Sequence, residues 1–579
     1  MSLKKRIFGI FIIFCLLVLW TCVTPDEKKA VQWKNGVVVS VDQYASQIGI
    51  DILKKGGNAV DAAVAVGFAL AVTFPAAGNI GGGGFMVIRF PDTGESVAID
   101  FREMAPAGAA PDMYLDEKGE VVTSKSYFGH LAVGVPGTVK GFELAIQKYG
   151  NLPWKDVIAP AIELAENGFV LNDRRANSFN GLKQMKKLPE DFKGSLAKSK
   201  EFFRIFSKPD GSDFVEGDIF VQKDLAESLK LIANHGSEAF YEGKIAELIT
   251  RDMEKYGGLI TKDDLAKYEA FVREPVKGNY RGYDIISMPP PSSGGTILIE
   301  MLNVLEGYEL GTMERYGPEV LHVISETMKF AYLDRAKYMG DAQFGDIPVK
   351  RLISKEHAQS IREKIDIHRA IPSAEIGEEI LTIEESEDTT HYSVIDKDGI
   401  AVATTYTLNG GYGAFVVAEG TGIILNNEMA DFNMKPGYTD EKGLIGTEPN
   451  LIAPHKRMLS SMSPTIIVKD GKTFMITGSP GGRTIINTVL NVIINVIDFG
   501  MDIQDAVDGY RIDHEWMPDI LNVEEEGIPE EVINSLMSMG HEIKTIRRQG
   551  DAHSIFVDPR TGIYYGAADK RSSGSAIGY

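Results

Sequence analysis

The chain has 579 residues, of which 44% are hydrophobic and 24% are charged, a composition typical of a globular protein. This length allows three or four average domains, or one large α/β body with intimately mixed halves. The net charge of −21 argues against nucleic acid as a partner and indicates an acidic surface.

The cysteines and histidines restrict the possible chemistry further. The two cysteines, Cys15 and Cys22, both lie at the start of the chain. The body that follows therefore has no disulfide framework, no thiolate metal site and no cysteine nucleophile. The ten histidines include no HExxH pair, so no metal site is expected.

Residues 1–22 have the pattern of an export signal. Three basic residues, at positions 4–6, precede an apolar core that runs from Ile7 to Trp20. This core is too short for a comfortable transmembrane helix. It ends close to Cys22 in a sequence similar to a bacterial lipoprotein signal, although the two residues before the cysteine are not the usual small ones. Three forms stay open: a lipid anchor on Cys22, a cleaved secreted form and an uncleaved anchor.

The first part of the body begins with a predicted strand at Val37, followed by a helix over residues 44–55. Asn58 is a good N-cap for the next helix, residues 59–72. That second helix is apolar almost all round and rich in alanine. The pattern predicts a buried core helix.

Four glycines, Gly81 to Gly84, lie between this helix and the next predicted strand. No GK[ST] follows them, so a phosphate cradle is disfavoured, and close backbone packing beneath a site is the better interpretation. The strand leads to Arg102, which stands between Phe101 and Glu103. Its guanidinium group forms either a surface ion pair or a fork for a substrate carboxylate.

The middle of the chain has no sequence pattern typical of a catalytic or binding site. From Phe128 the pattern predicts a strand, a Pro-Gly turn and amphipathic helices through residue 280. The Pro- and Gly-rich stretch 288–295 predicts a rigid turn before another helix. Asp334 and Arg335, inside a later helix, are expected to form a buried structural pair.

A β-hairpin follows an acidic segment, residues 371–388, which has the composition of a solvated linker. Two β-branched runs flank the triplet 397–399, which suits a three-residue hairpin loop with Gly399 in the left-handed region. Centring the hairpin on the middle residue of the triplet sets Thr389 opposite Thr407. Two hydroxyl groups would then meet at one end of a strand pair.

Such a hydroxyl group has either a structural or a catalytic role. A threonine pair in a strand is commonly no more than a β-former. A threonine hydroxyl becomes a good nucleophile when a base lies beside it, and an N-terminal threonine carries a base of its own, an α-amine with a pKa of about 7.7–8.0. The catalytic role therefore requires cleavage of the bond between Asp388 and Thr389.

Two polar groups follow the hairpin. Glu428 and Asp431, after Asn426, form either a solvated turn at a strand end or a carboxylate pair for a substrate ammonium group. Ser460 and Ser461 are of residue types that form turns.

Gly481 and Gly482 stand between a predicted strand and a predicted helix. They form either an ordinary tight turn or a pair of N–H donors aimed at an oxyanion. Residues 503–540 are expected to be rich in helix, and a last hairpin is predicted over residues 551–571.

The hairpin sequence TTHYSVIDKDG, followed by TYTLN, resembles the start of the small subunit of γ-glutamyltransferases (γ-glutamyltranspeptidases, glutathione hydrolases). The similarity runs from about Val37 to Tyr579 and includes the glycine stretch, DFREMAP and MPPPSSGG. Members of this family are N-terminal-nucleophile hydrolases that cut themselves before this threonine. The resemblance implies a mixed α/β (α+β) fold, a four-layer αββα sandwich. It also implies a large subunit, residues 23–388, and a small catalytic subunit, residues 389–579, which form a heterodimer.

The resemblance also implies the chemistry. Thr389 attacks the γ-glutamyl amide and its α-amine accepts the proton, while Thr407 orients the hydroxyl group. Gly481 and Gly482 stabilise the oxyanion, and the acyl group passes to water or to the amine of an amino acid or peptide. No cofactor and no metal are needed. The implied substrate-binding residues are Arg102, Ser460 and Ser461 for the α-carboxylate, and Asn409, Glu428 and Asp431 near the ammonium group.

Residues 434–450 resemble the lid loop of many bacterial members, with Lys442 where some of them have a gating tyrosine. The expected location is outside the cytoplasm: periplasmic, tethered by a lipid on Cys22, or secreted. Two alternatives remain. One is a sister acylase of the same fold, acting on β-lactams or poly-γ-glutamate, and the other is an exported lipoprotein that binds peptides without catalysis.

Overall fold

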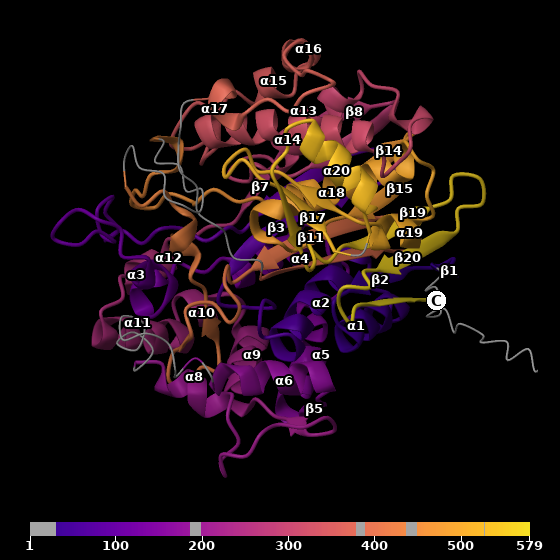
Figure 1. Ribbon diagram of the computed structural model, residues 1–579. Helices are drawn as coiled ribbons and strands as arrows, with labels where there is room; N and C mark the ends of the chain where they lie inside the picture. Colours follow the sequence, from indigo (N-terminus) through magenta and orange to yellow (C-terminus); the bar gives the residue numbers. More distant parts are fainter. Residues whose placement is uncertain (1–29, 184, 186–197, 378–387, 436–447, 526) are drawn as a thin grey trace, which may run out of the picture.

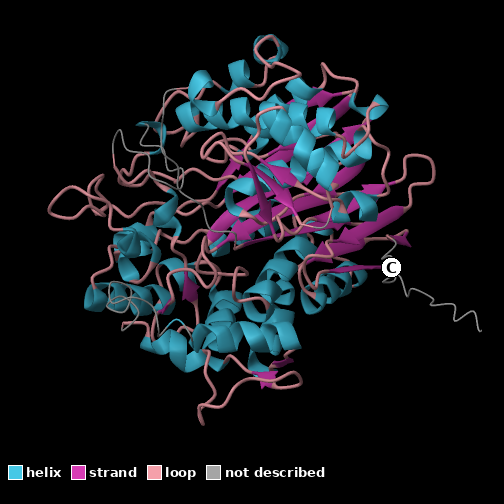
Figure 2. Cartoon of the chain, in the orientation of Figure 1, coloured by secondary structure: helices cyan, strands magenta, loops and turns pink. Residues whose placement is uncertain are grey.

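A computed structural model describes residues 30–183, 185, 198–377, 388–435, 448–525 and 527–579. The predicted export signal with Cys22, most of the acidic segment and Lys442 lie outside these residues. Two large antiparallel β-sheets form the centre of the molecule, and helices cover them (Figures 1 and 2).

The first sheet contains the predicted hairpin at its middle. All neighbouring strands in it are antiparallel. Its order is β21 (Ser575–Gly578), β2 (Val37–Ser40), β10 (Thr389–Ile395), β11 (Ala401–Thr407), β3 (Gly83–Arg89), β4 (Ser96–Asp100) and β7 (Phe271–Arg273).

The second sheet packs face to face on the first, and its neighbouring strands are also antiparallel. Its order is β1 (Val31–Trp33), β20 (Tyr564–Ala568), β19 (His553–Val557), β15 (Lys472–Thr477), β14 (Thr465–Lys469), β9 (Tyr283–Ser287) and β8 (Val276–Tyr280).

Helices cover the outer face of each sheet and complete a four-layer αββα sandwich, as predicted. The first sheet packs on α1 (Gln43–Lys54), α2 (Ala59–Thr73), α4 (Thr138–Tyr149) and α5 (Trp154–Asn167). The second packs on α13 (Gly294–Leu305), α14 (Pro318–Tyr338) and α18 (Ile485–Ile497). Figure 1 shows the two groups of helices on opposite sides of the strands.

The remaining elements are short or peripheral. They are α3 (Thr123–Tyr127), α6 (Asp173–Leu182), α8 (Lys200–Ile205), α9 (Lys223–His235), α10 (Glu238–Tyr241), α11 (Lys244–Tyr256), α12 (Lys262–Ala266), α15 (Val349–Leu352), α16 (Lys355–Arg362), α17 (Ser373–Ile376), α19 (Ile503–Asp508), α20 (Glu530–Ser538), β5 (Phe169–Val170), β6 (Ile219–Phe220), β12 (Val416–Val417), β13 (Ile424–Leu425), β16 (Ile512–Asp513), β17 (Leu521–Glu524) and β18 (Ile543–Ile546).

The alternation of side chains along the central strands explains the layers. In β10, Val394 packs among the helices on one face, whereas Ile395 packs between the two sheets. Because successive side chains in a strand point to opposite faces, a strand that is apolar at both positions must be covered on both sides. All seven residues of β10 are buried.

The local predictions around these layers are confirmed. Thr389 pairs with Thr407 across β10 and β11, and Gly399 has φ +81°. Helix α2 is buried along its whole length, and the Asn58 side chain and Asp61 form a reciprocal cap at its first turn.

Close packing at the glycine stretch is confirmed as well. A Cβ atom on Gly82 would lie 2.1 Å from the carbonyl oxygen of Thr407, and one on Gly81 would lie 2.1 Å from that of Ile424. The glycines therefore let this segment approach the end of β11 more closely than any side chain would allow.

Two sequence-based predictions were wrong. The strand expected at Phe128 is absent from the described residues there, which form a 3₁₀ turn at His130–Ala132 and a single bridge from Val135 to Met104. The segment 503–540 has two short helices but also strands β16 and β17, which join β18 in a small sheet with a parallel pair. Strands of two to four residues are too short to show a period, and their pairing depends on contacts outside the segment.

Both sheets combine strands from before and after Asp388. In the first sheet, β10 lies between β2 and β11, and in the second, β14 lies between β9 and β15. The two parts of the chain therefore share one core rather than forming separate domains.

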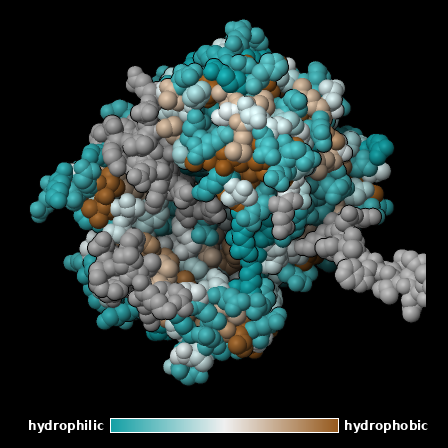
Figure 3. Space-filling model, in the orientation of Figure 1, coloured by the Kyte–Doolittle hydropathy of each residue, from teal (hydrophilic) through white to brown (hydrophobic). Residues whose placement is uncertain are grey.

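Among the described helices, none is long and apolar enough to cross a membrane. Figure 3 shows a mainly hydrophilic face, with apolar atoms gathered near the middle of the view.

We predict that Gly82→Ala displaces the end of β11. Because the new Cβ meets backbone rather than a flexible side chain, the cost should be about 1–3 kcal/mol of stability. Thermal unfolding should show a lower Tm than wild type. The matched control is Gly345→Ala, whose Cβ meets nothing within 4 Å, and it should leave the Tm unchanged. Equal Tm values for the two variants would contradict the proposed packing constraint.

Candidate active site

The two hydroxyl groups at the end of the hairpin are in hydrogen-bonding contact. Thr389 Oγ1 donates to Thr407 Oγ1 at 3.2 Å, and Thr407 Oγ1 in turn donates to the carbonyl oxygen of Asp388 at 3.2 Å. The Asn409 N–H donates to Thr407 Oγ1 at 2.8 Å. Thr407 therefore links the Thr389 hydroxyl group to the peptide bond that precedes Thr389.

The glycine stretch supports this hydroxyl pair from below. Asn79 Nδ2 donates to the carbonyl oxygen of Thr407 at 2.8 Å, and Asn79 Oδ1 accepts from the Gly82 N–H at 3.0 Å. Asn409 has φ +72°, a conformation that asparagine tolerates better than most residues. The end of β11 is thus held by several long-range bonds.

Arg102 is buried, with 1% of its surface exposed, so the surface ion pair considered from the sequence is wrong. Its guanidinium group contacts Glu428 and lies 2.5 Å from Asp431 Oδ2. It also donates to the carbonyl oxygens of Met458 and Leu459 at 3.3 and 2.9 Å. These contacts fix the plane of the guanidinium group.

Three carboxyl groups surround this one cation. Burial raises the pKa of Glu428 to about 8 and that of Glu103 to about 7, although Arg102 opposes both shifts. Burial lowers the pKa of Arg102, but the charges of Glu428, Asp431 and Glu103 together outweigh that effect, and the net shift is upward. The site therefore has more carboxyl groups than cations, which suits a ligand that brings an additional positive charge.

One of the two predicted serines, Ser461, is held by Arg335, for which the sequence predicted only a structural pair with Asp334. Arg335 donates to Ser461 Oγ at 2.7 Å and to Ser293 Oγ at 3.0 Å. Arg335 thus occupies an acceptor position of the Ser461 hydroxyl group and fixes where this side chain lies. Asp334, expected to pair with Arg335, has a different partner, His357.

Gly481 and Gly482 form the predicted turn between β15 and α18, with φ values of +134° and +55°. Within the described ranges, neither glycine N–H has a hydrogen-bond acceptor. The Thr484 hydroxyl group donates to the Gly481 carbonyl oxygen at 2.8 Å, which fixes the turn. Two unpaired N–H donors beside a pocket are what an anionic group requires.

Nine of the ten predicted site residues line one small cavity of about 20 Å³, and the tenth, Gly481, is adjacent in the chain to one of them. This volume is enough for about one water but far below the roughly 300–1,000 Å³ of small-molecule pockets, so a substrate enters only if side chains move. The lining residues are Arg102, Thr389, Thr407, Asn409, Glu428, Asp431, Ser460, Ser461, Met462, Gly482 and Ile485.

The predicted lid loop falls mainly on residues 436–447, outside the described ranges. Its described end contacts the site, because Asn450 Nδ2 donates to the carbonyl oxygen of Asp431 at 2.7 Å. Asn450 Oδ1 also accepts from the Leu459 N–H at 2.9 Å. This asparagine therefore links one of the acids to the segment that holds Arg102.

The chain is similar to known proteins over most of its length. The family model described as Gamma-glutamyltranspeptidase matches residues 45–579. The "Glutathione hydrolase proenzyme" of Escherichia coli (strain K12) is 48% identical over 553 residues, which cover 95% of this chain and 93% of the relative.

Two solved structures are also similar. The cephalosporin acylase from Bacillus halodurans has a TM-score of 0.83 at 29% identity and covers 96% of this chain and 98% of its own. A chain of Helicobacter pylori gamma-glutamyltranspeptidase has a TM-score of 0.54 at 48% identity and covers 58% of this chain and 93% of its own.

We predict that Arg102→Met destabilises the protein more at pH 8 than at pH 5. The pKa values of Glu103 and Glu428 are raised above their unfolded value of about 4.5, so these groups lose folding stability as pH rises through about 7 and 8. Removing Arg102 raises both pKa values further, so the loss of stability continues to a higher pH. A buried charge left unpaired costs about 3–5 kcal/mol. The measurement is Tm against pH.

The control for this experiment is Arg560→Met. Arg560 is largely exposed and lies 3.6 Å from Asp558 at the surface, so its loss should change the Tm little at either pH. A destabilisation by Arg102→Met that is equal at pH 5 and pH 8 would refute the electrostatic account of the cluster.

Proposed function

The chain belongs to the γ-glutamyltranspeptidase family, and we propose that it is a γ-glutamyltransferase and glutathione hydrolase. It cleaves the γ-glutamyl amide bond of glutathione and related compounds through an ester on Thr389. Water, or the amine of an amino acid or peptide, then accepts the acyl group. The observation that carries this proposal is the cavity that brings the Thr389–Thr407 hydroxyl pair together with Arg102.

We propose that maturation begins at the bond before Thr389. Thr389 Oγ1 attacks the carbonyl carbon of Asp388, whose oxygen already accepts a hydrogen bond from Thr407. The C–N bond breaks as the C–O bond forms, and the nitrogen keeps its proton, takes up the one that the hydroxyl group loses and becomes an α-amine. Water then hydrolyses the ester, which leaves a large subunit, residues 23–388, and a small subunit, residues 389–579.

Two observations support a two-subunit product. The E. coli relative is named a proenzyme, and the Helicobacter pylori chain corresponds to 58% of this chain. Because both sheets contain strands from both parts, the subunits stay associated as a heterodimer after the cut.

In the mature enzyme, the α-amine of Thr389 removes the proton from its own hydroxyl group, which attacks the γ-carbonyl carbon. Thr407 orients that hydroxyl group. The N–H groups of Gly481 and Gly482 stabilise the oxyanion, and such a donor typically contributes 10²- to 10³-fold in rate. The leaving amine takes the proton from the α-ammonium, and no cofactor takes part in these steps.

The α-amino acid end of the substrate replaces ion pairs between residues that line the pocket. Arg102, Ser460 and Ser461 bind the α-carboxylate, while Glu428, Asp431 and Asn409 bind the α-ammonium. Arg102 pairs with the two acids. A zwitterion supplies one anion for the arginine and one cation for the acids, so both sides keep a partner when the pair opens.

A sister acylase activity is the alternative, since the chain resembles a cephalosporin acylase over 96% of its length. The acid pair favours the γ-glutamyl group. A glutaryl group has the same carboxylate but no ammonium, and would leave Glu428 and Asp431 without a cation once Arg102 turns to the ligand.

We further propose that residues 1–22 direct export, so that the enzyme acts in the periplasm or outside the cell, with Cys22 as the site of a lipid anchor. The basic start, the apolar core and the cysteine at its end support this proposal.

We predict that the purified protein contains two chains, one of which begins Thr389-Thr390-His391, and that Thr389→Ala leaves a single uncut chain. Without the hydroxyl group, no acyl shift at Asp388 is available. Intact-mass measurement and N-terminal sequencing test this, and the same spectrum shows where the large subunit begins and whether Cys22 carries a lipid. The control, Thr390→Ala, alters the neighbouring hydroxyl group and should still be cut. An uncut wild-type chain would refute the proposal.

We also predict that the enzyme discriminates two donors that differ only in the α-amino group. L-γ-glutamyl-p-nitroanilide should be hydrolysed with a kcat/KM on the order of 10⁴-fold above that of glutaryl-p-nitroanilide, because the site's buried acids stay unpaired with the second compound. Release of p-nitroaniline measures both rates. Equal rates, or a preference for the glutaryl compound, would favour the acylase alternative.

A further inference from the structure

A second cluster of ionisable side chains lies outside the active-site cavity. Glu300 comes from α13, Asp334 from α14 and His357 from α16. His357 Nε2 is 2.6 Å from Asp334 Oδ2 and 3.4 Å from Glu300 Oε1. Figure 1 places these helices together in the outer layer, with α16 at the edge of the molecule.

Glu300 is the residue in this cluster whose burial needs an explanation. Its side chain is 0% exposed, and neither carboxylate oxygen has a hydrogen-bond donor within the described ranges. His357 Nε2 lies closer to Asp334, at 2.6 Å, than to Glu300 Oε1, at 3.4 Å, so Glu300 has only the longer and weaker of the two contacts. A buried carboxylate without a donor costs several kcal/mol, so Glu300 must hold a proton or face a cation.

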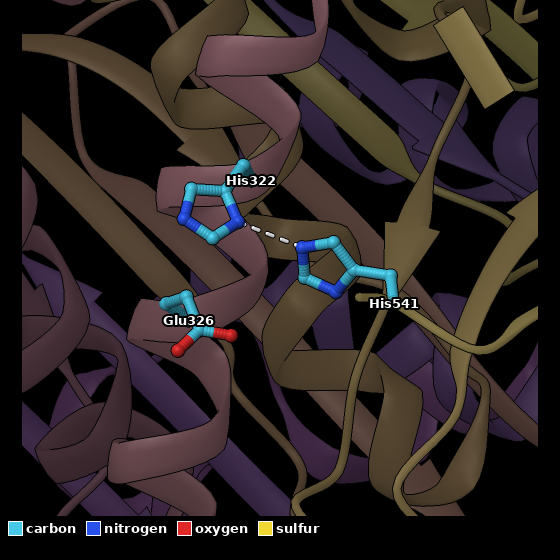
Figure 4. Close-up of side chains that lie close together, drawn as sticks. All are labelled: His322, Glu326 and His541. Atoms are coloured by element: carbon cyan, nitrogen blue, oxygen red, sulfur yellow. Dashed lines mark hydrogen bonds between the residues drawn. The ribbon is translucent and has the colours of Figure 1, made fainter. Parts of the chain in front are cut away.

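A second cluster in the same layer contains His322, Glu326 and His541, and its ionisable groups have close partners (Figure 4). His322 Nε2 lies 2.8 Å from the carbonyl oxygen of Asp366, and His322 Nδ1 lies 2.7 Å from His541 Nε2. Lys329 lies 2.9 Å from Glu326 Oε1 and supplies the cation. Because its groups already satisfy one another, this cluster needs no ion.

We propose that Glu300, Asp334 and His357 bind one divalent metal ion of the zinc or manganese class. One imidazole nitrogen with two carboxylate oxygens is a donor set that both ions accept. The three ligand atoms lie within 4.8 Å of one another. With bonds of about 2.0–2.2 Å, a tetrahedral ion holds its ligands roughly 3.3–3.6 Å apart, so the side chains need to move little.

Charge and access agree with this assignment. Two carboxylates with a neutral imidazole carry a net charge of −2, which a divalent ion neutralises. The Asp334 and His357 side chains are 14% and 13% exposed, so the ion has a path from solvent to the buried Glu300. The hydrogen bond to Asp334 and the nearby carboxylate of Glu300 raise the pKa of His357 to about 9, so before binding the ring carries a proton on each nitrogen. On binding, the Nε2 proton leaves to solvent, Nδ1 keeps its proton, and the Nε2 lone pair bonds to the metal.

The site would join three helices of the outer layer. Asp334 immediately precedes Arg335, the residue that donates to Ser461 in the active-site cavity. The ion therefore has a structural role, in that it fixes α14 against α13 and α16 on the side away from the substrate.

The test is titration of the chelator-stripped, full-length protein with Zn²⁺, and separately with Mn²⁺, by calorimetry. Wild type should bind one equivalent more than Glu300→Gln, a change that keeps the shape of the side chain and removes its charge. If Glu300→Gln still binds the ion, its affinity should be at least about tenfold lower than that of wild type. Loss of a residue that only hydrogen-bonds to a metal ligand already costs about tenfold or more. Heats measured in buffers of different ionisation enthalpy should show release of a proton.

The matched control is His541→Gln, in the cluster of Figure 4, which should bind as wild type does. Asp334→Asn is a second ligand variant in case Glu300→Gln misfolds, and circular dichroism reports folding of each protein. If wild type, Glu300→Gln and Asp334→Asn bind equal amounts of both ions, or if the extra equivalent disappears in His541→Gln, the cluster holds only a shared proton and the proposal is overturned.

Discussion

The register between β10 and β11 determines everything at the candidate active site. A shift of one residue would turn every side chain of β10 to the opposite face of the sheet and separate Thr389 from Thr407. The register is fixed far from the chemistry. Gly399 sets the loop with φ +81°. Tyr392 and Val394 of β10 must face the helices, and Ile395 must face the space between the two sheets. The position of the hydroxyl pair is therefore a consequence of core packing.

Arg102 imposes the second constraint, because one guanidinium group serves three carboxyl groups in a buried place. Charges removed from water interact strongly, and this arrangement is stable only while each buried charge has a partner of opposite sign. The same balance supports the zwitterionic substrate that we propose, whose two charges would replace the two halves of the existing pair. The ion pairs of Arg102 with Glu428 and Asp431 lie in the wall of the small cavity.

The features predictable from the sequence are those determined by neighbouring residues. The hairpin, the cap at Asn58 and the glycine packing depend on local patterns or on residue types with few alternatives. The hydrogen bonds from Arg335 to Ser461 join residues 126 positions apart, and no local pattern shows them. The strands β17 and β18 were missed for the same physical reason. The resemblance to a family brought distant residues such as Arg102 and Asp431 to one site, which spacing alone could not do.

The interleaving of the two sheets explains how a chain can be cut at its own active site without coming apart. Asp388 lies just before the first residue of β10, so cleavage there leaves the hydrogen bonds of β10 to β2 and β11 in place. Loss of the covalent link raises the entropy of the unfolded chain but changes few native contacts. In the maturation that we propose, the new amine forms at the end of a strand that is already held on both sides. The proposed cut would supply a base to Thr389, while the packing that positions this residue stays as it was.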